Sequence, residues 1–448
     1  MLLAAVLIPL SAVLVMRTGL SRGANLFATL LVGLLGVGAS SVHYLARPHV
    51  FTLFLLALSV GILAQDRERP TLRVWLLIPL VAVWTNLHGG FAALLACLGL
   101  LAAGVTLEAL WFGQAGPERW RTAKRYWLLT GLCTAATLVN PFGFRLHVHI
   151  AGYLRSDWIR NAVQEFQSPT FRDESATQYE ILLALAFISV AALVKRRLLA
   201  DALPVLFWAH MSLSSVRHVP IFVIVAAPII AAEMTRWWQA AVAGRDRRSL
   251  GVILDQLQAD LRAGLFRTSL VPVLAVAVLA FLDRPLKWPK DFPAEKFPVA
   301  LITRHAPELA RARVFTSDQW ADYLIYRSYP EQKVFFDGRS DFYGPQLGRE
   351  YVRMIQAQWD WEKLVRKHGF THVLAQGDWP LATVLKRHPD WLTVEDSGQA
   401  ILFRRARAAA GPAFPVGAVR PAGIDKKRSP WLMKGTEPAE ELRGDPPA

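Results

Sequence analysis

The stretch "VWLLIPLVAVWTNLHGGFAALLACLGLLAAGVTLEALW", residues 74–111, holds two apolar runs on either side of the polar segment "WTNLHGGF" at 84–91. Both runs are apolar enough to enter a membrane. Asn and His side chains cost free energy in hydrocarbon, and a pair of glycines weakens a helix. The stretch therefore predicts two membrane helices, and it places the polar segment between them at one edge of the bilayer.

The composition of the whole chain agrees with this interpretation. Of its 448 residues, 53% are hydrophobic and only 19% are charged. Long apolar runs alternate with short connectors that contain basic residues, Gly or Pro, which is typical of a polytopic membrane protein. The two cysteines, Cys97 and Cys133, each lie inside an apolar run. They predict neither a disulfide framework nor a metal site.

We expect about ten spans between residues 1 and 283. Several are short for a hydrocarbon core of about 30 Å, so tilted or partial spans are expected near 74–87 and 126–139. The predicted spans are 2–16, 24–42, 49–64, 74–87, 90–111, 126–139, 180–194, 198–214, 219–234 and 266–283.

In this predicted arrangement of spans, most basic residues lie on one side of the membrane. The connectors that we assign to the inside carry Arg17, Arg22, Arg67, Arg69, Arg73, Arg119, Arg121, Lys124, Arg125, Lys195, Arg196, Arg197, Arg236, Arg245, Arg247, Arg248 and Arg262. The outer connectors carry Arg47, Arg145, Arg155, Arg160, Arg172 and Arg217. The positive-inside rule and anionic head groups thus account for the net charge of +15, and we expect no nucleic-acid partner. An amphipathic helix at 249–262 is predicted to lie on the inner surface.

The composition changes after residue 283. A Pro- and charge-rich linker leads into a globular domain, so that residues 284–405 predict a small extracytoplasmic α/β domain with a mostly parallel sheet. Strands are expected at 313–316, 333–337, 371–375, 391–395 and 400–403, and helices near 345–368 and 379–388. Residues 406–448 are rich in Ala, Pro, Gly and charge, which predicts a disordered tail.

Polar residues gather at the outer ends of the predicted spans. They are Arg47, His49, Asn86, His88, Asn140, Arg145, His147, His149, Glu165, Arg217 and His218. A single His at a helix end is more often a cap or a hydrogen-bond partner than a catalyst, and none of these residues taken singly indicates a function. Arg47 and Arg217, however, run against the positive-inside bias, and Arg beside helix N-termini favours phosphate. We hypothesise that Arg47, His88 and Arg217 converge on a lipid-linked phosphate.

Two outer acids are candidates for catalysis. Asp337 follows a predicted strand in "FFDGRSDFYG", where Gly338 permits a tight turn and Arg339 and Asp341 are presented beside it. The alternative interpretation is an ion pair within the loop. Glu165 in "QEFQSP" lies next to the membrane. Either carboxylate would act as a general base toward an acceptor hydroxyl, or would hold a divalent cation.

Several motifs together resemble a known superfamily. They are Arg-Pro-His at 47–49, Trp-x-Asn-x-His-Gly-Gly at 84–90, Asn-Pro-x-Gly at 140–143, Glu-x-x-Ser-Pro at 165–169, Arg-His-x-Pro at 217–220 and "VFTSDQWADYLIYRSYPEQKVFFDGRSDFYG" at 314–344. This set is similar to a group of bacterial membrane proteins that look like GT-C fold glycosyltransferases, the superfamily of oligosaccharyltransferases and protein mannosyltransferases.

The resemblance implies a GT-C-like bundle in the bacterial inner membrane. It implies a polyprenyl-phosphate or polyprenyl-pyrophosphate sugar donor, with transfer on the extracytoplasmic side. The outer domain would help to bind the acceptor. "DQWADYL" at 318–324 resembles an acceptor motif of oligosaccharyltransferases through Trp320, Asp322 and Tyr323, but it lacks the usual Trp pair.

The start of the chain departs from that pattern. GT-C enzymes usually carry a catalytic acid in the first outer loop, whereas this chain has no outer acid before Glu165. We expect that a first span and loop precede Met1 in the natural protein; otherwise the protein is inactive. Two other function classes stay open: a lipid or solute transporter, and a non-catalytic membrane protein whose outer domain binds a partner. The few ionisable residues near the middle of the predicted spans count against transport.

Overall fold

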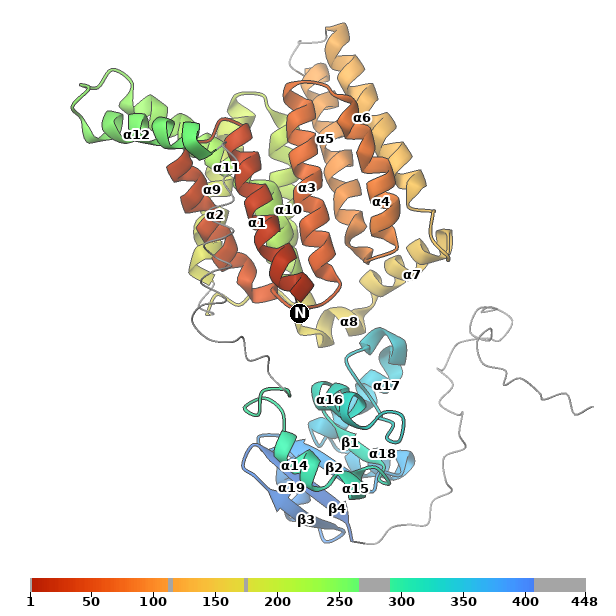
Figure 1. Cartoon of the computed structure of the whole chain (residues 1–448). Helices are drawn as coiled ribbons and strands as arrows, with labels where there is room; N and C mark the ends of the chain where they lie inside the picture. Colours follow the sequence, from red (N-terminus) through yellow and green to blue (C-terminus); the bar gives the residue numbers. More distant parts are fainter. Residues whose placement is uncertain (1, 112–115, 173–175, 266–290, 407–448) are drawn as a thin grey trace, which may run out of the picture. The chain divides into compact units, whose positions relative to one another are not determined.

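The structure is a computed structural model that describes residues 2–111, 116–172, 176–265 and 291–406. The chain forms two compact units (Figure 1). The described residues up to 265 belong to a helical unit, and those from 291 onward belong to a unit that combines helices with a small sheet. Each unit has its own hydrophobic core.

Helices make up most of the helical unit. They are α1 (Leu2–Ser21), α2 (Leu26–Ser40), α3 (His49–Glu68), α4 (Leu77–Thr85), α5 (Ala92–Trp111), α6 (Pro117–Ala136), α7 (Phe144–Arg155), α8 (Asp157–Ala162), α9 (Ala176–Lys195), α10 (Leu199–Ser214), α11 (Val219–Val242) and α12 (Leu250–Leu265). Short 3-10 segments lie at the helix ends: η1 (Ser41–His43), η2 (Leu72–Leu76), η3 (Gly89–Phe91), η4 (Gln164–Phe166) and η5 (Val216–His218).

Six of the helical segments are long and apolar enough to cross a membrane. They are Leu2–Ser21, Leu26–His43, His49–Glu68, Gly89–Trp111, Ala176–Lys195 and Val216–Val242. This finding confirms the prediction of a multi-pass membrane protein. The segment Leu72–Thr85 is apolar but shorter. The expected tenth span, 266–283, lies outside the described residues, and the count of ten stays a prediction.

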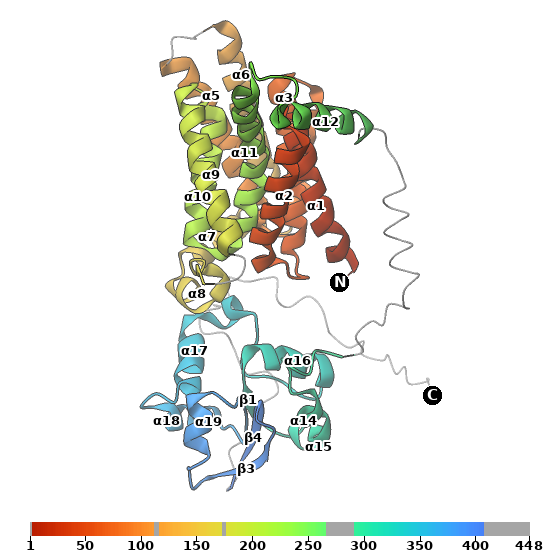
Figure 2. The same cartoon turned by 90° about the vertical axis from the view of Figure 1, so that its left-hand side faces the viewer.

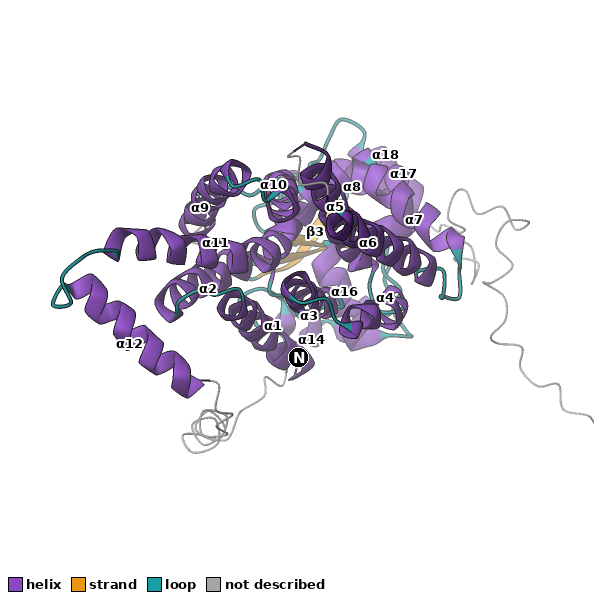
Figure 3. Ribbon diagram, turned by 90° about the horizontal axis from the view of Figure 1, so that it is seen from above, coloured by secondary structure: helices purple, strands orange, loops and turns teal. Residues whose placement is uncertain are grey.

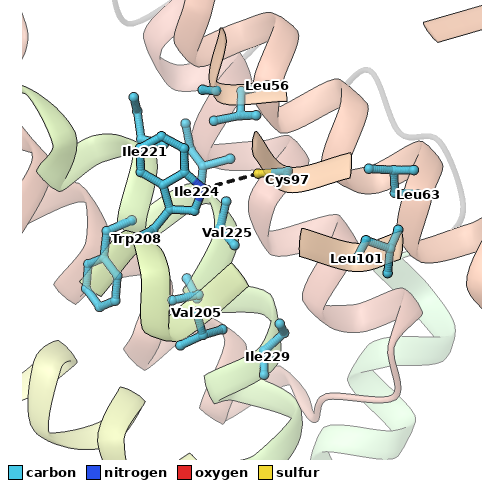
Figure 4. Packing of buried hydrophobic residues seen from close by; sticks show 14 of the residues in the cluster. Leu56, Leu63, Cys97, Leu101, Val205, Trp208, Ile221, Ile224, Val225 and Ile229 are labelled. Carbon is cyan, nitrogen blue, oxygen red and sulfur yellow. Dashed lines mark hydrogen bonds between the residues drawn. The ribbon is translucent and has the colours of Figure 1, made fainter. Parts of the chain in front are cut away.

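Helix α11 forms the centre of the helical unit. It packs against α1, α2, α3, α9 and α10, and every residue from Val219 to Ala232 is buried. Viewed from above, α11 lies between these neighbours (Figure 3). Figure 4 shows Ile221, Ile224 and Val225 of α11 against Trp208 of α10, whose indole N–H donates to the sulfur of Cys97 on α5 at 3.2 Å. A helix that is apolar on all sides is expected at such a buried position.

Segments between the long helices differ partly from expectation. The outer stretch around 140–175 was treated as a loop, yet it contains α7 and α8. The predicted amphipathic segment is helical, as α12, and it runs across the directions of the other helices of this unit (Figures 1 and 3). Its residues Leu250, Ile253, Leu257 and Leu261 are exposed at helical spacing, which is the pattern of a helix that lies on a membrane surface.

The second unit contains short helices and four strands. The helices are α14 (Val299–Arg304), α15 (Ala306–Leu309), α16 (Asp318–Ser328), α17 (Ser340–Ile355), α18 (Trp361–His368) and α19 (Pro380–Leu385). The strands are β1 (Val314–Thr316), β2 (His372–Gln376), β3 (Trp391–Asp396) and β4 (Ala400–Arg405), in the sheet order β1-β2-β4-β3. The positions of all four strands were predicted from the sequence.

The sheet itself corrects two predictions. Only β1 and β2 run parallel, with Phe315 opposite Val373, whereas β4 is antiparallel to both β2 and β3. The expectation of a mostly parallel sheet was therefore wrong, because a short turn joins β3 directly to β4. The strand expected at 333–337 does not form. Phe335 instead packs its ring against Phe315 and Phe370, with centroids 6.0 and 5.0 Å away, so these residues fill the core beside the sheet.

Candidate functional site

Seven polar residues from four separate segments meet at one end of the helical unit. They are His43 at the end of η1, Arg47 and His49 at the start of α3, His88 before η3, Glu165 in η4, and Arg217 and His218 in η5. We call them the rim cluster. This is the end at which α7 and α8 lie, at the bottom of the helical unit in Figures 1 and 2. The threading of the sequence had assigned all of these segments to one side.

Two of the segments are joined by two hydrogen bonds. The hydroxyl of Ser215 donates to the carbonyl of Glu165 at 2.8 Å, and the Val216 N–H donates to the carbonyl of Gln167 at 2.9 Å. The guanidinium of Arg217 lies over the ring of Phe166, 4.3 Å from its centroid. A cation over an aromatic face is held electrostatically while its N–H groups at the edge stay available. These contacts position Arg217 beside Glu165.

The Glu165 carboxylate lies near Arg47 and His43 without a direct hydrogen bond to either. Its Oε2 is 3.8 Å from Nη1 of Arg47 and 4.0 Å from Nε2 of His43. Both distances exceed that of a normal hydrogen bond, and 28% of the Glu165 side chain is exposed. Its oxygens can therefore accept a proton or a hydrogen bond from a ligand. His43 was not singled out in the sequence, because it lies in the last turn of an apolar helix and carries no motif.

His88 is fixed in one tautomer. Its Nδ1 accepts from the backbone N–H of Gly90 at 3.1 Å and from the hydroxyl of Thr52 at 2.8 Å, while that hydroxyl accepts from the indole N–H of Trp84 at 3.1 Å. The ring proton therefore lies on Nε2. Burial, together with the nearby charges of Arg217 and His49, lowers the pKa of His88 to about 4. His88 is thus a neutral N–H donor at physiological pH.

The two remaining histidines of the rim cluster bond to backbone carbonyls. Nε2 of His49 donates to the carbonyl of His43 at 2.9 Å, and Nδ1 of His218 donates to the carbonyl of Met211 at 3.1 Å. The rings of His43 and His49 also lie 4.4 Å apart. These contacts close the turn that carries Arg47 and fix the start of α11.

Other polar residues predicted at this end have local partners. Asn86 is exposed, and its side-chain amide donates to the carbonyls of Ala82 and Val139. It ties the end of α4 to the end of α6, so substrate binding by Asn86 stays a prediction without a contact that supports it. Asn140 bonds within its own turn, and Nε2 of His147 contacts the hydroxyl of Thr137 at 2.8 Å. Arg145 and His149 lie on α7.

Several cations at the opposite end of the helical unit are paired with acids. Asp201 pairs with Arg22 at 2.6 Å and with Arg67 at 3.7 Å, Asp66 pairs with Arg125 at 2.8 Å, and Glu233 pairs with Arg196 and Arg236. In the rim cluster, Glu165 is the only acid that the described residues bring within 4.0 Å of its cations. Arg217 has no acidic partner among the residues described. The rim cluster therefore carries an excess of positive charge that suits an anion.

In the second unit, the side chain of Asp337 is fully buried at the start of a tight turn. Its Oδ1 accepts from the backbone N–H and Nε of Arg339, both at 2.9 Å, and its Oδ2 accepts from Nη2 of Arg339 at 2.5 Å and from the Tyr343 hydroxyl at 2.8 Å. Burial alone would raise the pKa of Asp337, but these hydrogen bonds outweigh it and hold the pKa below its usual value. Both oxygens are occupied, as in the loop ion pair considered as an alternative.

The acceptor-like motif divides between core and surface. Trp320 and Tyr323 are buried in the core of the second unit, where their polar atoms bond to the Lys296 carbonyl and the Asp291 carboxylate. Asp322, on the opposite face of α16, is exposed and accepts from the backbone N–H of Gly338 at 3.3 Å. A Cβ at position 338 would meet Asp322 Oδ2 at 2.8 Å, so a larger residue there would require the Asp322 carboxylate to shift. The side chain of Asp341 lies outside what the structure describes.

A metal site is not evident in the described parts of either unit. No group of three or more His, Cys, Asp or Glu residues among them is placed to hold a metal ion. The rim cluster offers one carboxylate and several neutral or bonded imidazoles, which is a poor set for a divalent cation that prefers oxygen ligands. No known family model matches the chain, and no curated protein is significantly similar to it.

Proposed function

We propose that the chain is an integral membrane glycosyltransferase-like protein of GT-C type. It takes a sugar from a polyprenyl-phosphate or polyprenyl-pyrophosphate donor and transfers it to an acceptor on the extracytoplasmic side of the bacterial inner membrane. The observation that carries the proposal is the rim cluster, in which Arg47 lies 3.8 Å from the accessible Glu165 carboxylate, and Arg217 and the neutral His88 lie at the same end of the membrane-capable helices.

Each of these residues has its own role in the proposed reaction. The acceptor nucleophile forms a bond to the anomeric carbon as the bond from that carbon to the phosphate oxygen breaks. Glu165 accepts the proton of the nucleophile. Arg47, Arg217 and the Nε2–H of His88 donate to the phosphate oxygens, where negative charge increases as the lipid phosphate leaves.

The second unit is assigned to acceptor recognition. Asp337 holds Arg339 and Tyr343 in place and is given a positioning part, because both of its oxygens are already bonded. Asp322 and Arg339 are exposed beside that turn and are proposed to contact the acceptor. The ring of Phe342, half exposed, lies 5.4 Å from the Arg339 guanidinium and extends the same surface.

A non-catalytic protein that binds a lipid phosphate is the second candidate. It is favoured by the 3.8 Å approach of Arg47 to Glu165, which fits a carboxylate that serves as a charge partner rather than as a base. In that case the outer unit recruits a partner, and the lipid phosphate only localises the protein.

A turnover assay separates these two candidates. The full chain in detergent is incubated with a polyprenyl phosphate that carries a radiolabelled hexose, with a cell-envelope extract as the acceptor. We expect transfer by the wild type and a loss of about 100-fold or more in Glu165→Gln, since a positioned base contributes that much, while Glu165→Gln still binds the lipid. Binding without transfer in the wild type would instead support the non-catalytic candidate, and absence of binding would contradict both.

Sidedness is tested separately. Single cysteines at Arg155 and Asp378, both exposed, are treated in intact cells with a membrane-impermeant maleimide after Cys97 and Cys133 are changed to Ala. Labelling of both positions from outside agrees with the proposal. Labelling of Arg155→Cys alone would contradict the part in acceptor recognition that is proposed for the second unit.

A further inference from the structure

A hollow with basic residues in its lining lies at the end of the helical unit opposite to the rim cluster. Helix α3 runs from His49 in the rim cluster to Glu68 at this far end, and the chain then turns at Pro70 into η2. The hollow has a volume of about 410 Å³ and is lined by Pro70, Trp75, Arg121, Thr122, Lys124, Arg125 and Leu128. It takes no part in the proposed reaction.

One wall of this hollow is rigid. Arg125 donates to both carboxylate oxygens of the buried Asp66, at 2.8 and 3.3 Å, and to the carbonyl of Thr71 at 2.5 Å. Its guanidinium also lies over the indole of Trp75, 5.3 Å from the centroid. Tyr126 donates to the same carboxylate at 3.1 Å. The charge of Arg125 is therefore used within the protein, and it holds Trp75 and the start of η2 in position.

The other two cations of the hollow differ from Arg125 in their surroundings. Arg121 and Lys124 are both exposed, and neither has an acidic partner among the residues that the structure describes. Arg121 lies one turn before Arg125 on the same helix and Lys124 lies directly before it, and both side chains line the hollow. Two unpaired cations beside a preformed hollow favour a ligand with a phosphate group.

The same face of α6 changes from basic to apolar. Arg121 and Arg125 are followed at helical spacing by Leu128 and Leu132, which are 56% and 41% exposed. A phosphate held by Arg121 and Lys124 would thus have an apolar strip directly beyond it along the helix. That order, cation and then exposed leucine, matches a phospholipid with its head group at the membrane surface and its acyl chain in the hydrocarbon.

We propose that this hollow binds the head group of an anionic phospholipid, with Arg121 and Lys124 contacting the phosphate and Leu128 and Leu132 contacting an acyl chain. Trp75 closes the hollow at the level of the interface, where indole rings are favoured. The site is independent of the proposed sugar transfer and would hold whether or not the rim cluster is catalytic.

Native mass spectrometry of the full chain in detergent tests this site. Phosphatidylglycerol and phosphatidylcholine are added at equal concentration, and bound lipid is counted for the wild type and for Arg121→Gln/Lys124→Gln. We expect the double substitution to lower phosphatidylglycerol binding about tenfold or more, since each basic residue near a membrane contributes to attraction of anionic lipid, and to leave phosphatidylcholine unchanged. The reciprocal pair Arg121→Lys/Lys124→Arg should retain binding.

A matched control removes two charges elsewhere at the same end. Arg245→Gln/Arg247→Gln changes exposed residues in the loop between α11 and α12, and it should leave phosphatidylglycerol binding as in the wild type. An equal loss in this control, or no loss in Arg121→Gln/Lys124→Gln, would overturn the proposal. Binding of inorganic phosphate as strong as that of phosphatidylglycerol would also overturn the proposal, since the acyl contact would then contribute nothing to affinity.

Discussion

The hydroxyl of Thr52 on α3 lies 2.8 Å from Nδ1 of His88, and it accepts the indole N–H of Trp84 at 3.1 Å. One hydroxyl thus accepts a hydrogen bond from the buried Trp84 and, by donating to His88, fixes the tautomer of that histidine. The polar segment at 84–91 is explained by this link: Trp84 is buried and anchors the turn, and His88 presents its Nε2–H beside Arg217.

Replacing Thr52 by Val should destabilise the helical unit. The indole N–H of Trp84, which is fully buried, would lose its acceptor, and an unpaired buried donor costs about 1–3 kcal/mol. Thermal unfolding in detergent should show a lower midpoint for Thr52→Val and nearly the wild-type midpoint for Thr52→Ser, which keeps the hydroxyl. Equal unfolding midpoints for Thr52→Val and Thr52→Ser would show that the hydrogen bonds of this hydroxyl do not stabilise the helical unit.

Acidification should destabilise the protein through His88. Its pKa is about 4 in the folded protein and about 6.5 in an unfolded chain. The folded state therefore favours the neutral ring, so the contribution is present above pH 6.5 and is lost as pH falls from 6.5 toward 4. His88→Asn, whose amide oxygen replaces Nδ1 as the acceptor, should show a smaller drop of the unfolding midpoint between pH 7 and 5. An unchanged drop would contradict the assignment.

Two glycines of α5 offer a matched pair for the packing of the helical unit. A Cβ at Gly104 would meet the backbone of Ala200 on α10 at 2.4 Å, whereas a Cβ at Gly99 would meet nothing within 4 Å. Gly104→Ala should cost about 1–3 kcal/mol, because two helix backbones would have to separate. Gly99→Ala should be neutral or slightly stabilising. Unfolding midpoints of both variants in one detergent test the contact, and similar values would contradict it.

Asp337→Asn should lower the stability of the second unit. Three donors from Arg339 and the Tyr343 hydroxyl would lose a charged acceptor, at a cost of about 1–3 kcal/mol. Asp378→Asn, at an exposed position after β2, is the control. Limited proteolysis of the full chain should cleave Asp337→Asn faster than Asp378→Asn. If Asp337→Asn is as resistant as the control but has lost transfer, Asp337 is catalytic and the positioning part is wrong.

Much of the architecture follows from patterns that the sequence makes explicit. Apolar runs locate the membrane helices, and the sorting of basic residues places Arg47, His88, Glu165 and Arg217 at one end, where the structure also brings them together. His43 and Thr52 could not be identified in this way. Each belongs to an apolar helical segment, and its role depends on residues that only the fold brings into contact with it. The strand expected at 333–337 failed for a similar reason: Phe335 and Phe336 have strand propensity, but aromatic packing uses them instead.

The central claim is that the rim cluster binds a lipid-linked phosphate, and a titration of polyprenyl phosphate into the full chain in detergent tests it most directly. Arg217→Gln removes a guanidinium that has no acidic partner among the described residues. Arg155→Gln removes the same charge from the exposed end of α7. We predict that Arg217→Gln weakens binding about tenfold or more, since a charge-assisted hydrogen bond is lost, and that Arg155→Gln binds as the wild type does. Equal affinity of Arg217→Gln and the wild type would contradict the account.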